Sequence, residues 1–244
     1  MRKAVFRNYG PPEVLHVIEC DEPTPKPNQV RIRIHATTVT AAEAAMRRGE
    51  PLWGRPMVGL TKPRKRYQTL GTELAGVVDA VGREVKRFRE GDEVFGFAGW
   101  NIGANADYLC LPEDASLCAK PSNTSFGQAA AAVDGATTAL HFLRDRANLR
   151  AGQRVLIIGA AGSIGTYAVQ LAKRFGAEVT GVCGTSNVAL VRSLGADEVI
   201  DYRNEDFREA GARWDVVFDT VGAGSFAQSK TVLVERGIFL PTVI

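Results

Sequence analysis

The stretch VLIIGAAGSIGTYAVQLAK, Val155–Lys173, decides the fold because it joins an apolar run to a helical pattern through a glycine-rich turn. The apolar run predicts a buried strand, and the apolar spacing from Ser163 onward predicts a helix. Three glycines, Gly159, Gly162 and Gly165, lie at the junction with the spacing G-x-x-G-x-x-G. The usual dinucleotide fingerprint is G-x-G-x-x-G. The turn is therefore either a cofactor cradle or only a tight strand-to-helix connection.

The turn fits a phosphate-binding role when it is aligned on the two glycines that this role needs. Gly162 would let phosphates approach the backbone, and Gly165 would let the helix pack on the strand. The helix N-terminus offers free N–H groups and the positive end of the helix dipole. In this register Ala160 takes the first glycine position, and Gly159 is an extra residue that loosens the strand end. The predicted cradle consists of Ala160, Ala161, Gly162, Ser163, Ile164 and Gly165.

Composition sets limits on the function. The chain has 244 residues, 45% of them hydrophobic and 23% charged, with a net charge of +3, which suits one large or two small globular domains. The mild charge predicts no polyanionic partner. The N-terminus lacks a signal-peptide core, and no apolar run is long enough to predict a membrane span. Four scattered cysteines form no zinc spacing and favour a reducing, cytoplasmic compartment.

The first part of the chain is predicted to be rich in β-strands. Residues 30–37, VRIRIHAT, alternate apolar and polar side chains, which is typical of a strand with one buried face. Residues 74–82 and 92–99 predict further strands, bounded by turn residues.

From residue 125 onward, helices and strands are predicted to alternate. Residues 125–147 predict a helix that opens on the capping box Ser125-x-x-Gln128 and is interrupted near Asp134-Gly135. Such an alternation predicts an α/β fold with a doubly wound parallel sheet. The predicted strands are 154–159, 178–183, 198–200, 215–221 and 237–244, and the following helices are 163–176, 187–195 and 225–235.

The end of the second of these strands bears on the choice of dinucleotide. An acidic residue there binds the ribose hydroxyls of NAD, and its absence leaves room for the 2′-phosphate of NADP. Residues 182–187 contain no acidic residue, and Glu178 lies at the opposite end of the strand. We therefore expect NADPH, with NADH as the alternative. The predicted contacts are Cys183, Thr185, Ser186 and Tyr202, with Arg203 as a candidate basic partner.

The chain resembles the zinc-independent quinone oxidoreductase (zeta-crystallin-like) branch of the medium-chain dehydrogenase/reductase superfamily. The resemblance implies a GroES-like β-rich domain over 1–124 and a Rossmann domain over 125–244. It also implies hydride transfer from NADPH to a quinone or an α,β-unsaturated carbonyl, and a homodimer. The stretches that carry it are YGPPEVL (9–15), LGTELAGVVDAVG (70–82), FREGDEVFGF (88–97), TTALHFL (137–143), residues 155–173 and LGADEVIDY (194–202).

The resemblance also implies roles for particular residues. Thr138 would lie beside the nicotinamide, and Thr220 and Val221 would border the cofactor. Zinc-dependent members carry a cysteine where this chain has Thr40 and a histidine where it has Thr72, and neither threonine is a suitable zinc ligand. We therefore expect no metal site. Thr40 is the candidate catalytic hydroxyl, although its capping box with Glu43 offers an equally good structural explanation.

The chain also departs from the family pattern. Many members have asparagine in place of Thr40 and a basic residue after the second strand. Family members usually continue beyond the fifth strand, so we expect a Rossmann sheet that lacks its last strand and the C-terminal return. A truncated member acting as a non-catalytic nucleotide- or RNA-binding module is the alternative function.

A few further residues admit two interpretations. Glu73 is either a catalytic carboxylate or, as we favour, structural, and Asp134 is expected to end a helix rather than face a cleft. Trp53 and Trp100 either line a substrate pocket or pack in loops. The basic run KPRKR, residues 62–66, is expected to be a solvated loop, and we predict no nucleic-acid partner.

Overall fold

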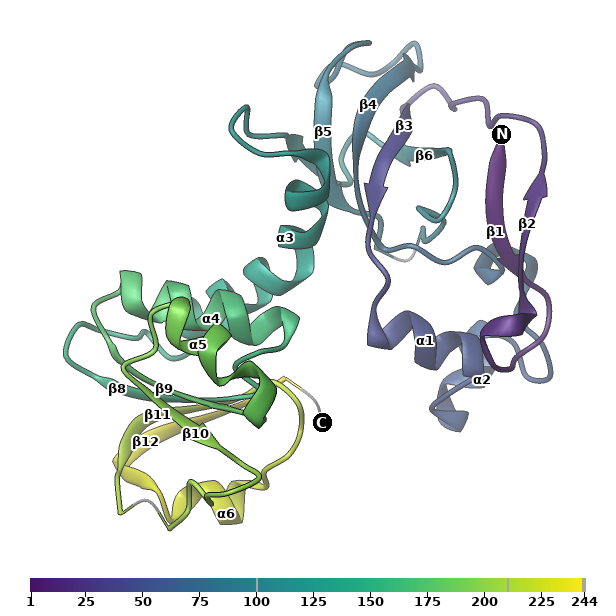
Figure 1. The fold of residues 1–244 in the computed structure, drawn as a ribbon. Coiled ribbons are helices and arrows are strands. Elements are labelled where there is room, and N and C mark those ends of the chain that lie inside the picture. Colours follow the sequence, from purple (N-terminus) through teal and green to yellow (C-terminus); the bar gives the residue numbers. More distant parts are fainter. Residues whose placement is uncertain (100, 210, 243–244) are drawn as a thin grey trace. The chain divides into compact units, whose positions relative to one another are not determined.

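The computed structural model describes residues 1–99, 101–209 and 211–242 (Figure 1). Its contacts separate two units, Met1–Val133 and Asp134–Ile244. Trp100, and the last two residues of the strand expected over 237–244, lie outside the described residues. The functional domain limits of 1–124 and 125–244 stay a prediction.

The first unit is built around an antiparallel sheet in which one inner strand follows the predicted alternation. In β3 (Gln29–Thr37), Val30 and Ile32 are buried, whereas Arg33 and His35 are exposed. The strand pairs with both of its neighbours in antiparallel register, which confirms the predicted β-rich fold. The strands β4 (Glu73–Val81), β5 (Glu93–Phe97), β6 (Tyr108–Pro112) and β7 (Ser116–Ala119) complete the five-stranded order β6-β3-β4-β5-β7.

A hairpin and a helical connection complete this unit. The hairpin pairs β1 (Arg2–Phe6) with β2 (Leu15–Glu19). The connection from β3 to β4 carries α1 (Ala41–Arg48) and the single turn α2 (Arg55–Val58). Short 3-10 turns occur at Pro12–Val14, Leu52–Gly54 and Lys65–Tyr67.

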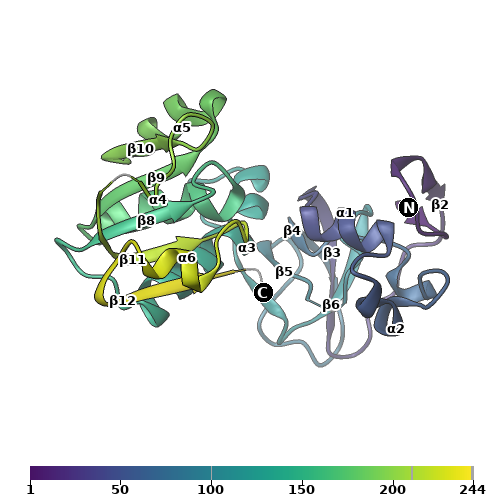
Figure 2. The same ribbon diagram turned by 90° about the horizontal axis from the view of Figure 1, so that it is seen from below.

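The second unit contains a parallel sheet with the order β10-β9-β8-β11-β12, which Figure 2 shows from below. Every strand pair in it is parallel, as the predicted alternation requires. Counted along the chain, this is the 3-2-1-4-5 order of a Rossmann sheet, whose direction of winding reverses between β8 and β11. The strands are β8 (Arg154–Ile158), β9 (Glu178–Cys183), β10 (Glu198–Asp201), β11 (Trp214–Asp219) and β12 (Leu233–Pro241).

Both faces of this sheet are covered, because alternate residues of β8 enter different apolar clusters. Val155 and Ile157 pack with residues of α4 (Ser163–Arg174) and α5 (Val188–Ser193). Leu156 and Ile158 pack on the other face, where Figure 1 shows α6 (Phe226–Lys230). Burial on both faces explains the continuous apolar run from which the strand was predicted. No helix among the described residues is long and apolar enough to cross a bilayer.

Two helix predictions are wrong. The expected break near Asp134 does not occur, because α3 runs without interruption from Phe126 to Leu140 and a π-helical turn, His141–Arg146, follows it. Gly135 is retained inside α3 because a Cβ there would lie 2.6 Å from Ser163 Oγ, so the glycine permits close packing on α4.

The helix expected over 225–235 is also too long, because it ends at Lys230 and β12 begins at Leu233. Val232 and Leu233 are buried among the residues on one face of the sheet. Tertiary packing of these two side chains therefore overrides the helical pattern.

Two glycine substitutions test the packing of α4 on the sheet. A Cβ at Gly165 would lie 2.1 Å from the Gly159 carbonyl oxygen, so we expect Gly165→Ala to lower the free energy of unfolding by about 1–3 kcal/mol. At Gly127 in α3 the nearest atom is 3.9 Å away, so Gly127→Ala should raise it by about 0.5 kcal/mol. Urea denaturation measures both, and equal midpoints for the two variants would contradict this account.

Candidate functional site

The glycine turn lies at the carboxyl edge of the parallel sheet, between β8 and α4. Gly159 has a φ of +80°, which L side chains rarely adopt. A Cβ on this residue would lie 2.6 Å from both Thr220 Oγ1 and Val221 Cγ1. The prediction that Gly159 is an extra residue is therefore wrong, because its backbone conformation and the loop after β11 both require glycine.

The other two glycines shape the start of α4. Gly162 is the N-cap, with extended backbone angles, and no side chain caps the helix there. A Cβ on Gly162 would meet only the Gly159 carbonyl oxygen, at 3.3 Å, and Gly162 and Ser163 are exposed. The first N–H groups of a twelve-residue helix therefore face accessible space, which is the arrangement that binds a pyrophosphate.

The alanines of the turn are placed differently from each other. Ala160 is fully buried, and its N–H donates to the Val182 carbonyl oxygen at 2.9 Å. Its side chain and N–H therefore support the cradle from behind. Ala161 and Ile164 are half-buried beside the exposed residues of the turn. Direct contact of each of these residues with a cofactor stays a prediction.

The loop after β11 is organised by Asp219, which the sequence analysis missed. Its buried carboxylate accepts backbone N–H bonds from Val221 (3.0 Å), Gly222 (2.9 Å) and Gly224 (2.8 Å). The hydroxyl of Thr220 donates to the Ile158 carbonyl oxygen at 2.8 Å. These bonds hold Thr220 and Val221 against the glycine turn. An acidic residue at the end of a buried strand, followed by glycines, is the sequence signal for such a loop.

Helix α3 reaches the same edge through the contact between Gly135 and Ser163. Thr138 follows Gly135 by about one helical turn, and its hydroxyl lies 3.3 Å from Asp134 Oδ1. The structure therefore brings Thr138, the glycine turn and the Thr220–Val221 loop to one region of the second unit.

The end of β9 has an acidic neighbour that the sequence did not place there. Asp201, at the end of β10, is the register partner of Cys183 and accepts a hydrogen bond from Thr185 Oγ1 at 2.6 Å. The pKa of Asp201 lies below its ordinary value, mainly because of this hydrogen bond and to a smaller extent because the Arg203 N–H also donates to its carboxylate. The Thr185 proton is thus already donated. Cys183 is buried, whereas Ser186, Tyr202 and Arg203 are exposed.

In the first unit, the two positions at which zinc-dependent relatives have ligands meet at one carboxylate. Glu43 is buried, and its Oε1 accepts from the Thr72 N–H at 2.9 Å and the Thr72 hydroxyl at 3.2 Å. Its Oε2 accepts from the Thr40 N–H at 3.3 Å, while Thr40 Oγ1 accepts from the Glu43 N–H at 3.2 Å. The predicted capping box is confirmed.

The carboxylates near Thr40 and Thr72 are engaged in hydrogen bonds. The bonds to Thr40 and Thr72 occupy both oxygens of Glu43, and Glu73 accepts from the Thr38 hydroxyl. The part of the chain that the structure describes contains no cluster of three histidine, cysteine or acidic residues suited to a metal ion.

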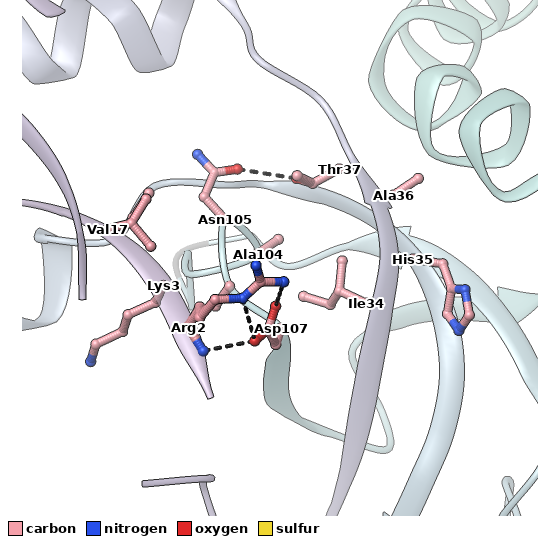
Figure 3. Close-up of a pocket in the computed structure, with 12 residues that line it drawn as sticks. Arg2, Lys3, Val17, Ile34, His35, Ala36, Thr37, Ala104, Asn105 and Asp107 are labelled. Atoms are coloured by element: carbon pink, nitrogen blue, oxygen red, sulfur yellow. Dashed lines mark hydrogen bonds and ion pairs between the residues drawn. The ribbon is translucent and has the colours of Figure 1, made fainter. Parts of the chain in front are cut away.

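A hollow of about 410 Å³ in the first unit lies beside β1 and β3 and contains none of the predicted site residues (Figure 3). Arg2 and Asp107 form an ion pair in it, at 3.4 Å. The Arg2 backbone N–H, more than its guanidinium, holds the pKa of Asp107 below its ordinary value. Thr37 and Asn105 hydrogen-bond each other at 3.3 Å. These polar groups are engaged with one another, so no function is assigned to the hollow.

Comparisons with known proteins cover both units. A model of the alcohol dehydrogenase GroES-like domain matches residues 26–127, and a model described as zinc-binding dehydrogenase matches residues 163–240. A quinone oxidoreductase of Pseudomonas aeruginosa is 34% identical, over 98% of this chain and 72% of that protein. A 2-methylene-furan-3-one reductase of Solanum lycopersicum is 35% identical, over 99% of this chain and 63% of that protein.

Solved structures agree with these matches. The quinone oxidoreductase of Coxiella burnetii superposes with a TM-score of 0.88 at 32% identity, covering 98% of this chain and 74% of that one. A quinone oxidoreductase of Escherichia coli, solved in complex with NADPH, gives a TM-score of 0.85 at 29% identity, covering 98% of this chain and 72% of that one.

Two aspartates of β11 provide a matched test of the candidate site. Asp219→Asn places an amide N–H₂ among backbone N–H donors, so we expect a loss of about 1–3 kcal/mol in stability and at least a tenfold weaker affinity for a nicotinamide dinucleotide. Asp215 accepts the Arg154 N–H at 2.8 Å, at the opposite end of the strand. Asp215→Asn should leave the affinity unchanged. Calorimetric titration measures the dinucleotide affinity of both variants, and equal losses of affinity would contradict the role of Asp219.

Proposed function

The chain belongs to the quinone oxidoreductase branch of the medium-chain dehydrogenase/reductase superfamily, and on that premise we propose that it reduces a quinone or an α,β-unsaturated carbonyl with NADPH and without zinc. The observation that carries the proposal is the turn of Gly159, Gly162 and Gly165 at the edge where β8 and β11 meet. Substrates of this class are also supported by the names of two relatives, a quinone oxidoreductase and a 2-methylene-furan-3-one reductase.

The residues of the second unit suit a nicotinamide dinucleotide. We assign the pyrophosphate to the N–H groups at the start of α4, where Gly162 leaves the backbone accessible. Thr138 and the loop of Thr220 and Val221 would border the nicotinamide. When bound, the reduced nicotinamide supplies a hydride. The role of the protein is then to position the substrate and to stabilise the charge that develops on its oxygen.

Selection of NADPH is assigned to the exposed residues after β9 and β10. Thr185 already donates its proton to Asp201, so Ser186 and Arg203 are the proposed partners of the 2′-phosphate. Tyr202 is exposed and its hydroxyl lies near Gly184, where a Cβ would be 3.2 Å away. Its ring is therefore a candidate surface for the adenosine part of the cofactor.

Thr40 is the proposed hydrogen-bond donor to the substrate oxygen. Its Oγ1 accepts the Glu43 N–H as a helix cap, and this leaves the hydroxyl proton available for donation. Cap and donor are thus compatible roles for one side chain. The zinc ligand positions are occupied by hydroxyl groups tied to Glu43, which supports a reaction without a metal.

Cofactor titration tests the proposal. We expect NADPH to bind more tightly than NADH, and Arg203→Ala to weaken NADPH binding by about tenfold through the loss of a charge-assisted hydrogen bond. NADH binding should change less than twofold. Arg192 lines a hollow with Arg154 and Trp214, at the start of the strands, so Arg192→Ala is the control and should change neither affinity.

Nicotinamide fluorescence measures these affinities, and turnover is followed on a panel of quinones and enones. The absence of binding to either dinucleotide would overturn the proposal. Binding without turnover of any member of the panel would favour the non-catalytic alternative.

Substitutions at Thr40 separate its two roles. Thr40→Asn keeps a side chain that caps helices and can donate, so we expect kcat/KM to stay within about fivefold. Thr40→Val removes the cap and the donor, so we expect a loss of about 1 kcal/mol in stability and at least a tenfold lower kcat. Thermal unfolding and steady-state kinetics measure both effects. Equal kcat values for the two variants would restrict Thr40 to its structural role.

A further inference from the structure

Residues 51–72, which connect α1 to β4, carry charge of a single sign. This docking segment contains five cations and no acidic residue, and it is flanked by Glu50 and Glu73. Lys62, Arg64, Lys65 and Arg66 are exposed, and no ion pair within the described residues involves Lys62, Arg64 or Lys65. Its charge is therefore presented outward.

The same segment also exposes large apolar side chains. Trp53 is 81% exposed and Leu52 is 70% exposed, in the short 3-10 turn before α2. Leu60 is 69% exposed and Met57 is 51% exposed. Four large apolar side chains this accessible within nine residues are uncommon on a protein surface and indicate an interaction site.

The docking segment is held in a defined conformation. The Arg64 N–H donates to the Val58 carbonyl oxygen at 2.8 Å, and its guanidinium donates to the Pro56 carbonyl oxygen at 2.9 Å. The Tyr9 hydroxyl donates to the Gly59 carbonyl oxygen at 2.6 Å, and Arg55 lies 4.9 Å over the Tyr9 ring. The apolar side chains of this segment are thus displayed from a fixed backbone, which Figures 1 and 2 show as the blue loop that carries α2.

We propose that the docking segment binds the surface of an anionic lipid bilayer. Lysine and arginine are attracted to anionic headgroups, and a tryptophan with neighbouring aliphatic side chains is the composition that enters the headgroup region. The exposed side chains of Leu52, Trp53, Met57 and Leu60 provide the apolar contact. The cations at 62–66 provide the charge complementarity. The chain then sits on the membrane as a peripheral protein.

The apolar side chains favour a bilayer over nucleic acid. A single strand of RNA is bound by cations interleaved with exposed aromatic rings on which bases stack. Tyr67, which follows the basic run, is buried, and Arg66 lies 4.6 Å over its ring. The sugar-phosphate backbone of RNA offers no apolar surface that Leu52, Met57 and Leu60 could contact. A bilayer uses both the cations and the apolar side chains.

Vesicle sedimentation tests the proposal with the full chain. We expect binding to vesicles of phosphatidylcholine with about one third phosphatidylglycerol, and little binding to phosphatidylcholine alone. Each cation near the surface contributes about fivefold in affinity, so Lys62→Glu with Lys65→Glu should weaken binding by at least about 25-fold. Raising the salt from 50 to 300 mM should weaken binding of the unaltered chain.

A control pair distinguishes the docking segment from the net charge. Arg83 and Lys86 are exposed just beyond the far end of β4, about 30 Å along the strand from Glu73. Arg83→Glu with Lys86→Glu makes the same change in net charge and should alter vesicle binding less than threefold. Equal losses for both pairs would overturn the proposal. Thermal unfolding and dinucleotide affinity confirm that each variant is folded. None of the substituted residues is assigned a role in dinucleotide binding.

Tryptophan fluorescence locates the contact. Of the three tryptophans, Trp214 is fully buried and Trp53 is exposed. In a Trp100→Phe background, anionic vesicles should therefore shift the emission to the blue, and Trp53→Phe should abolish this shift. A shift that persists in Trp53→Phe overturns the proposal. Binding to a single-stranded RNA without binding to anionic vesicles also overturns it, and assigns the basic run to nucleic acid. The readout requires no turnover, so it stands apart from the proposed reaction.

Discussion

The close approach of α4 to the end of β8 is the constraint on which the second unit depends. The Gly159 carbonyl oxygen occupies the space that a side chain on Gly165 would fill. This contact seats the first turn of α4 directly above the strand end. The free N–H groups of the helix are thereby fixed at the edge of the sheet where β8 and β11 meet. A side chain at position 165 would push α4 away from the strand end, and the positive end of the helix dipole would then lie away from this edge of the sheet.

Buried acidic side chains hold the segments around that edge and around Thr40. Asp219 gathers the N–H groups of the loop after β11, and Asp201 ties Thr185 to the end of β10. Glu43 does the same in the first unit, where it joins Thr40 to Thr72. In each case a carboxylate satisfies backbone donors that a loop would otherwise leave unpaired. Candidate site residues such as Thr40 and Thr185 are thus held in place by acidic side chains that are themselves buried.

Local patterns predicted the elements, but contacts between distant segments decided several roles. The alternation in β3, the apolar run of β8 and the packing role of Gly165 follow from short-range periodicity and spacing. The need for glycine at position 159 arises from Thr220 and Val221, about sixty residues later, and no local pattern reports it. The hydrogen bond between Thr185 and Asp201 likewise depends on the parallel register of β9 and β10.

The same reasoning explains where helix prediction failed. Gly135 predicts a break because glycine costs about 1 kcal/mol in a helix. Its packing against Ser163 offsets this cost. Val232 and Leu233 continue a helical pattern, but both are buried against the sheet, and β12 begins at Leu233. In both cases packing between distant segments outweighs the local helix propensity, and the periodicity of a single sequence carries no information about such packing.

The distribution of charge distinguishes the two binding surfaces proposed for this chain, the docking segment and the glycine turn. A net charge of +3 hides the fact that residues 51–72 contain five cations and no acid. The glycine turn, by contrast, would bind its diphosphate with backbone N–H groups and a helix dipole, and carries no cationic side chain between Gly159 and Gly165. The two surfaces thus attract anions by different means. Charge reversal at Lys62 and Lys65 alters the docking segment, whereas a glycine substitution alters the backbone of the turn, so each surface can be altered while the other is left intact.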